Sequence, residues 1–538
     1  GKGGTGGSVG GSATGGSSGK GGSAGTGGTG GAAGGGTGGT GGAAGGGTGG
    51  SAGRGGSGGS AGTGAAGGGS GGTAGGSGGT AGGSGGTGGT GGSPVAPGTI
   101  LWARSLSQSY PTGAIESGSG VLVTAFFFSP IDVGAGTTYV PAGDANTVIA
   151  DFAVSDAHHI YSVPFGGGGQ AFGFVTGASS GNAIVDGVSY CDPGANPPCT
   201  GNDLGKGTVQ GGGGPGADGF VARWMPSSPA WVRRLVGPGD DKLIASALGP
   251  PNASDDTVYV GGWFDSGSTT LDGLSGNLPW AGDRDILIAQ YDAFSGAFLW
   301  AKTFGSPSRD ELSAIAFKGS SLFLAGVFGR SSTDSLTLGT TTLNCAGDDD
   351  VWAGKFMPDG TPVWAVRFGG TMDDRGARLA VDAAGDVYLA GIIHDQVVFG
   401  TKTWVSAGGG DIFVVKLRGS DGGVLWSTAF GDVGDDEPTG ILVDAKGDLV
   451  VSGTITGPIE TNGPFGGATD AFVVAFDPAN GNRRWSKMIG GTGADNGGTL
   501  SAGVGALYVT VGTGGAIDLG TPIIGEANPT GLVLKMQP

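Results

Sequence analysis

The chain has 538 residues, of which 131 are glycine, and a formal net charge of −18 at pH 7. An acidic surface of this kind repels nucleic acid and anionic lipid, because phosphate binding requires clustered lysine and arginine. No hydrophobic stretch approaches the roughly 20 residues of a membrane-spanning helix, so the composition predicts neither a nucleic-acid-binding protein nor a transmembrane segment.

Residues 1–98 are expected to be a low-complexity tether. Up to Ser93 the chain is almost entirely Gly, Ser, Thr and Ala, and Lys2, Lys20 and Arg54 are its only charges. Such a segment lacks the apolar residues that offset the entropy of ordering, so we expect a random-coil arm. Packed polyglycine-type helices are a disfavoured alternative. Without these three positive charges the remainder carries −21 and is strongly acidic.

From residue 99 to residue 538 one motif recurs every 59 to 70 residues. Its marker is an aromatic residue followed four positions later by another large apolar residue, and on a strand these two side chains share a face. Seven markers predict seven units. The markers are Trp102, Tyr161, Trp231, Trp300, Trp364, Trp426 and Trp485.

Each unit is predicted to contain four antiparallel strands. Upstream of the later markers, two short strands flank a D-x-x-G-D turn, as at Asp382–Asp386 and Asp444–Asp448, where the glycine supplies positive φ. Four strands joined as a meander form one propeller blade. The predicted fold class is therefore all-β: a seven-bladed β-propeller behind a disordered Gly-rich arm.

The two ends of the domain complement each other. The segment from Ile100 matches the marker strand of a unit, but no third strand precedes it. The segment from Gly531 matches the third strand of a unit, but no marker strand follows it. We therefore expect the N-terminal strand to complete the last blade as its outermost strand. Ring closure of this kind hides edge strands from aggregation, and it favours a monomer.

The second unit departs from the pattern. About ten residues separate Tyr161 from the strand at 171–176, which we take as too few for a full first strand, and an insertion is expected at about 177–217. Cys191 and Cys199 bracket a proline-containing loop and are candidates for a local disulfide, with two unpaired thiols as the alternative. Cys345 is left over. A disulfide would favour an oxidising compartment.

Acidic residues follow the marker strand in successive units, and ring geometry would gather them on one face. A ring of carboxylates can hold a hard cation such as calcium, whereas the favoured interpretation is that each carboxylate caps its own turn. No copy has the calcium-loop pattern D-x-[DN]-x-[DN]-G. The candidates are Asp240, Asp241, Asp310, Glu311, Asp373, Asp374, Asp435, Asp436 and Asp495.

The repeat resembles the SBBP-type β-propeller repeat family, well over residues 231–538 and loosely over 100–230. The resemblance implies a secreted or surface-attached bacterial protein, similar to myxobacterial surface lipoproteins, and implies no single activity. Any signal peptide or lipid-anchor cysteine would lie upstream of residue 1. The residues that carry the resemblance are Trp364, Phe368, Gly369, Gly370, Asp373, Asp374, 379–382, 385–391 and 413–417.

The hairpin from Ala475 to Trp485 resembles the tryptophan-docking motif of quinone-dependent dehydrogenase propellers, in which the motif is a packing device. We expect no quinone and no other cofactor, with calcium as the open alternative.

The favoured function is that of a non-enzymatic, exported or cell-surface scaffold that binds a protein or glycan partner. The alternative is a secreted polysaccharide hydrolase or lyase, which would need two carboxylates about 5–10 Å apart in an open channel.

Overall fold

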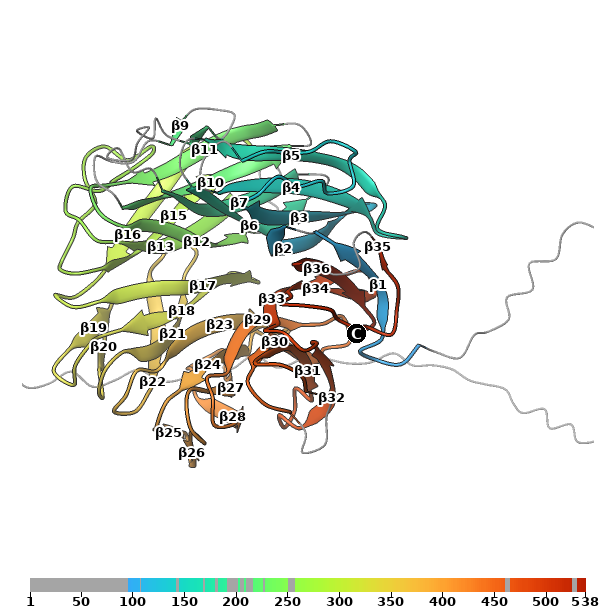
Figure 1. Ribbon diagram of the computed structural model, residues 1–538. Coiled ribbons are helices and arrows are strands. Elements are labelled where there is room, and N and C mark those ends of the chain that lie inside the picture. Colours follow the sequence, from blue (N-terminus) through green and yellow to red (C-terminus); the bar gives the residue numbers. More distant parts are fainter. Residues whose placement is uncertain are drawn as a thin grey trace, which may run out of the picture. The chain divides into compact units, whose positions relative to one another are not determined.

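The computed structural model describes residues 95–538, apart from 107, 142–144, 168–169, 180–181, 191–201, 204–207, 210–215, 226–227, 250–256, 460–464 and 525–529. The tether expected at 1–98 therefore lies almost wholly outside the described residues. Within them the regular structure is β-strand, and none of their segments forms a helix able to cross a membrane. Figure 1 shows these strands grouped into sheets around a common centre.

Seven antiparallel sheets form the blades, which confirms the predicted seven-bladed propeller. In blades 1 to 6 the strands run in sequence order from the central channel outward, whereas the outermost strand of blade 7 is the first strand of the chain. Blade 1 consists of β2 (Ser109–Ser117), β3 (Gly120–Phe127), β4 (Asn146–Ala153) and β5 (His159–Gly167). Blade 2 consists of β6 (Gln170–Ser179), β7 (Asn182–Tyr190), β10 (Ala217–Met225) and β11 (Ser228–Val236). Blade 3 consists of β12 (Asp241–Leu248), β13 (Thr257–Phe264), β15 (Asp285–Asp292) and β16 (Phe298–Phe304).

The later blades are more regular. Blade 4 consists of β17 (Asp310–Lys318), β18 (Ser321–Phe328), β21 (Asp350–Phe356) and β22 (Pro362–Phe368). Blade 5 consists of β23 (Arg375–Val381), β24 (Val387–Ile393), β27 (Asp411–Leu417) and β28 (Val424–Phe430). Blade 6 consists of β29 (Glu437–Val443), β30 (Leu449–Ile455), β31 (Asp470–Phe476) and β32 (Arg483–Ile489). Blade 7 consists of β33 (Asn496–Gly503), β34 (Ala506–Gly512), β36 (Gly531–Met536) and β1 (Ile100–Ser105).

The ring closes as the sequence predicts. Strand β1 pairs antiparallel with β36, with Ala103 opposite Leu534, so the first described strand is the outermost strand of the last blade. Two backbone hydrogen bonds extend the pairing, from Gly98 N to Gln537 O and from Gln537 N to Thr99 O, both 2.9 Å. Opening the ring would therefore require breaking a sheet within blade 7.

Blade 2 corrects two expectations. Strand β6 is a full first strand of ten residues that pairs with β7 along its length, so the expectation of a truncated strand was wrong. The connection from β5 to β6 is very short, which leaves enough residues for the strand. Because β6 and β7 extend to Tyr190, the insertion begins after that residue and not at 177. Cys191 and Cys199 lie outside the described residues.

Additional short strands cover the outer edges of several blades. The connection between the second and third strands of blade 3 contains β14 (Thr270–Leu271), which pairs with β11 of blade 2. In blade 2 the same connection contains β8 (Asn202–Asp203) and β9 (Thr208–Val209), and β8 pairs with β5 of blade 1. Strand β35 (Ile523–Ile524) pairs with β1. Covered edges offer fewer free backbone groups to another chain.

Blades 4 and 5 carry two-stranded hairpins in the corresponding connections. These are β19 (Ser335–Leu338) with β20 (Thr341–Asn344), and β25 (Gln396–Phe399) with β26 (Lys402–Val405).

The marker aromatics lie on the outermost strands and dock on the next blade. A β-bulge precedes each marker, as between Lys355 and Phe356 opposite Trp364, and it turns the ring toward the neighbouring blade. The indole Nε1 of Trp364 then donates to Gly419 O at 3.2 Å in the β27–β28 hairpin. Equivalent bonds lead from Trp102 to Val154 O, from Trp231 to Ala293 O and from Trp426 to Pro478 O. Each pair joins consecutive blades.

Candidate functional site: the central channel and its rim

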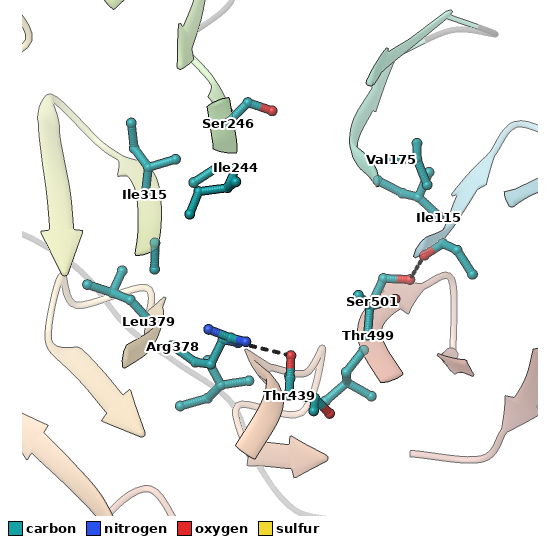
Figure 2. Close-up of a pocket in the computed structure, with 16 residues that line it drawn as sticks. Ile115, Val175, Ile244, Ser246, Ile315, Arg378, Leu379, Thr439, Thr499 and Ser501 are labelled. Atoms are coloured by element: carbon teal, nitrogen blue, oxygen red, sulfur yellow. Dashed lines mark hydrogen bonds between the residues drawn. The ribbon is translucent and has the colours of Figure 1, made fainter. Parts of the chain in front are cut away.

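The central channel is lined by the innermost strands of all seven blades, which enclose a cavity of about 250 Å³. Figure 2 shows side chains from these strands around the central space. Every inner strand pairs with its neighbour across a β-bulge, which increases its local twist. Each blade contributes one large aliphatic side chain to the lining: Ile115, Val175, Ile244, Ile315, Leu379, Ile441 and Leu500. The cavity wall is therefore largely apolar.

The polar side chains of the channel link neighbouring blades. The hydroxyl of Thr439 in blade 6 donates to Gly498 O of blade 7 at 2.7 Å, and that of Ser501 in blade 7 donates to Ala114 O of blade 1. Ser246 in blade 3 donates to Asp186 of blade 2 at 2.8 Å. These hydroxyl groups therefore form hydrogen bonds between neighbouring blades.

Arg378 is the one charged residue among the described residues that line this cavity. Its Nε donates to Thr439 O at 3.2 Å, which adds a link between blades 5 and 6. Burial lowers the pKa of Arg378, and the nearby carboxylate of Glu437 opposes that shift. The described residues that line the cavity include no carboxylate, so two acidic groups of the kind that glycoside hydrolysis requires do not meet among them.

The buried aspartates among the acidic candidates accept hydrogen bonds from the backbone of nearby loops. Asp310, Asp374, Asp436 and Asp495 are completely buried at the start of an inner strand. One carboxylate oxygen of each accepts the backbone N–H of the residue four positions earlier, as from Asp432 N to Asp436 at 2.8 Å. For the last three, the other oxygen accepts an N–H beyond the second strand of the same blade, as from Thr456 N at 2.7 Å. The carboxylate of each of these aspartates is therefore engaged by backbone N–H groups near the start of its own inner strand.

Asp241 is also completely buried and accepts a hydrogen bond from the Thr269 hydroxyl at 3.0 Å. Burial raises the pKa of Asp241, Asp310 and Asp374 to about 7, and the hydrogen bonds that they accept oppose the shift. In blade 3, burial likewise raises the pKa of Asp285 to about 6. These groups are therefore poised to bind protons near neutral pH.

The other acidic candidates are engaged in pairs or turns. Glu311 contacts Arg284 and, at 2.9 Å, Arg309, and Asp373 pairs with Arg375 at 2.9 Å. Asp240 accepts from Ala217 N at 2.9 Å, and Asp435 accepts from Gly410 N at 3.0 Å. Across the described part of the chain, no three acidic, histidine or cysteine side chains come close enough together to hold a metal ion. The candidates therefore share one end of the propeller without converging.

We call this end, which carries the loops from each outer strand to the next inner strand, the connecting face. At the starts of the inner strands of blades 5, 6 and 7 it contains a pocket of about 440 Å³. Its polar lining combines Arg375 and His394 with Asp435, Glu437 and Asn496. The pocket therefore presents charged groups of both signs next to the apolar side chain of Ile392.

Sequence reasoning identified Asp435 and Asp436 of this lining and missed Arg375, His394, Glu437 and Asn496. Arg375, Glu437 and Asn496 each directly follow the buried aspartate of their blade, and this shared position is a signal that the sequence does contain. It was missed because the pocket forms only where three blades meet.

Cys345 lies apart from these sites. It is a free, buried thiol whose pKa is raised to about 12 by burial.

No family model matches the sequence, and no curated protein matches it. The structure is similar to the WD40 domain of Pan2 from Neurospora crassa, with 9% identity over 82% of this chain and 96% of that chain and a TM-score of 0.37. It is also similar to BamB from Moraxella catarrhalis, with 14% identity over 82% and 92% of the two chains and a TM-score of 0.34. A third is the quinohemoprotein alcohol dehydrogenase ADHIIG from Pseudomonas putida, with 10% identity over 81% and 76% and a TM-score of 0.36. The likeness is one of fold alone.

Proposed function

We propose that this β-propeller is a non-enzymatic scaffold that binds a protein or glycan partner on its connecting face. The observation that carries the proposal is the channel wall, which is largely apolar, has no carboxylate among its described lining residues and uses its hydroxyl groups to link blades. A rigid ring that is closed by a shared sheet presents its loops in fixed positions, which reduces the cost of ordering them on binding.

The location proposed for this scaffold is the outside of a bacterial cell, free or held by a lipid anchor. The support is the resemblance of residues 231–538 to SBBP-type repeats and the Gly-rich composition that precedes the propeller. The sequence encoded upstream of residue 1 would test this location, and a signal peptide with a lipobox cysteine there would support it. A gene start without either would contradict it.

The experiment that tests the function separates binding from turnover. The purified chain would be incubated with a panel of neutral and acidic polysaccharides, with reducing ends and unsaturated products followed over time. The same panel and a fraction of extracellular proteins would be tested for saturable binding. Saturable binding without turnover is expected, whereas turnover of any member of the panel would favour the hydrolase or lyase.

Variants of the pocket locate the binding surface. Asp435→Asn and Glu437→Gln change exposed side chains, so both variants should fold. The matched control is Asp421→Asn, an exposed aspartate in the β27–β28 hairpin at the other end of blade 5. Weaker binding by the pocket variants, with the control unchanged, is the expected result.

A further inference from the structure

Three aromatic side chains gather at the connecting face of blade 1, and we call them the aromatic triad: Tyr110, Phe126 and Phe128. Tyr110 in β2 lies directly opposite Phe126 in β3, with ring centroids 5.2 Å apart and ring planes 20° from parallel. The centroid of Phe128 lies 6.2 Å from that of Tyr110 and 5.5 Å from that of Phe126. Tyr110 is 46% exposed and Phe128 is 48% exposed. The triad therefore presents aromatic rings to solvent.

The other blades show that the fold does not require these aromatics. The strand registers align blades 3 to 7 with blade 1 residue by residue. At the position of Tyr110 these blades have Lys242, Glu311, Arg375, Glu437 and Asn496. At the position of Phe128 they have Asp265, Gly329, His394, Thr456 and Gly514. The other blades fold with polar residues or glycine at both positions. The packing of a blade therefore does not require aromatic side chains at the positions of Tyr110 and Phe128.

Blade 3 shows what these positions can bind. Trp263 occupies the position of Phe126, and two cationic groups lie over its ring: the ammonium of Lys242 at 5.0 Å and the guanidinium of Arg284 at 4.1 Å from the centroid. In blade 1, Tyr110 replaces the lysine. Among the residues that the structure describes, no cationic side chain lies over the ring of Tyr110 or Phe128.

The charge of the protein favours a cationic occupant. The chain beyond the Gly-rich segment carries −21, and such a field attracts basic ligands and repels acidic ones. Arginine and lysine bind to exposed aromatic faces, arginine more often, and aromatic clusters are common energetic centres of protein interfaces. We propose that the aromatic triad is the docking surface for a protein segment that presents arginine or lysine side chains. This inference rests on the proposed binding function and specifies its partner class.

The test uses synthetic probes and a variant that borrows residues from the other blades. The variant combines Tyr110→Asn and Phe128→Thr, which are the residues of blade 7 and blade 6 at these positions, so blade 1 should still fold. The control is Phe294→Thr, which removes a phenylalanine that is 69% exposed in the β15–β16 hairpin. Unchanged melting temperatures would verify the fold of both proteins.

The probes are a short arginine–glycine peptide, its glutamate–glycine counterpart and a neutral β-linked glucose oligosaccharide, each titrated by calorimetry. The arginine peptide should bind the unmodified chain, more weakly as salt is added, and the double variant should lose roughly tenfold or more in affinity. Phe294→Thr should bind as the unmodified chain does. Equal binding of the glutamate peptide, equal binding by the double variant, or oligosaccharide binding that the double variant abolishes would overturn the proposal.

Failure of this inference is distinguishable from failure of the proposed function. If the double variant still binds the partner found with the polysaccharide panel or the extracellular fraction, the scaffold function stands and the triad is not its docking surface. If the unmodified chain turns over a polysaccharide, the scaffold function itself is wrong.

Discussion

Gly296 in the β15–β16 hairpin of blade 3 lies directly against the indole ring of Trp231 from blade 2. A Cβ at this glycine would stand 2.7 Å from Cδ2 of that ring, and its φ of 70° is one that side chains disfavour. The same pairing recurs between Trp364 and Gly422 and between Trp426 and Gly481. In blade 1 the corresponding hairpin has Ala157 with a φ of 57°, so one blade accepts the backbone strain.

Replacement of this glycine should weaken the contact between blades. Gly296→Ala is expected to lower the free energy of unfolding by about 2–4 kcal/mol, since the positive φ alone costs about 1–2 kcal/mol and the methyl group also meets the indole. The matched control is Gly319→Ala, which has a φ of 63° but nothing within 4 Å of the added methyl. Urea unfolding midpoints would measure both. Equal losses in the two variants would show that the indole contact contributes nothing.

The docked tryptophans should contribute more to stability than exposed ones. Trp364 is 8% exposed and lies in the apolar layer between blades 4 and 5, so Trp364→Ala should cost about 3–5 kcal/mol. Trp280 is 47% exposed, and Trp280→Ala should cost about 0.5 kcal/mol or less. Thermal and urea unfolding would compare the two. Similar losses would argue against docking as a source of stability.

Stability should rise on mild acidification. Asp241, Asp310 and Asp374 have native pKa values of about 7, well above the value of about 3.9 for an unfolded aspartate. Between these values the native state binds more protons than the unfolded state, so the free energy of unfolding falls as the pH rises through this window. We expect a higher urea midpoint at pH 5.5 than at pH 8, and a weaker pH dependence in Asp374→Asn. A midpoint that falls on acidification to pH 5.5 would contradict this prediction.

Removal of the closing strand should open the ring. Deletion of residues 1–106 removes β1 and exposes the edge of β36, so we expect a lower melting temperature and aggregation in light scattering. Deletion of residues 1–90 leaves β1 in place and should leave the melting temperature unchanged. If both truncated chains melt alike, β1 does not hold the ring closed.

Calcium is not expected to stabilise the protein. The acidic candidates that would hold it are bound to backbone N–H groups or paired with arginine, as Asp495 is with Gly491 N at 2.7 Å. A ligand that binds only the native state raises the melting temperature, so EDTA should leave this temperature unchanged. A clear decrease that calcium reverses would establish the cation-binding alternative.

The number of blades and the closure of the ring can both be predicted from the amino-acid sequence without coordinates. Both follow from local regularity: a marker such as Trp364 and its partner Phe368 share a strand face, and the segments from Ile100 and Gly531 each lack what the other supplies. The hairpin from Ala475 also resembles the tryptophan-docking motif in the sequence, and in the structure its Gly481 lies against the indole ring of Trp426. Strand alternation and turn chemistry act over a few residues, so they can be recognised without coordinates.

Tertiary structure alone decided what the acidic residues do and where a partner could bind. Asp373 and Asp374 are neighbours in the sequence, yet one pairs with Arg375 near the surface while the other is completely buried. Both residues lie in the loop before β23, where Asp374 accepts the backbone N–H groups of Gly370 and His394, and this folding of the loop determines which of the two is buried. The pocket of Arg375 and Glu437 likewise exists only because the ring brings strands about 60 residues apart in sequence side by side.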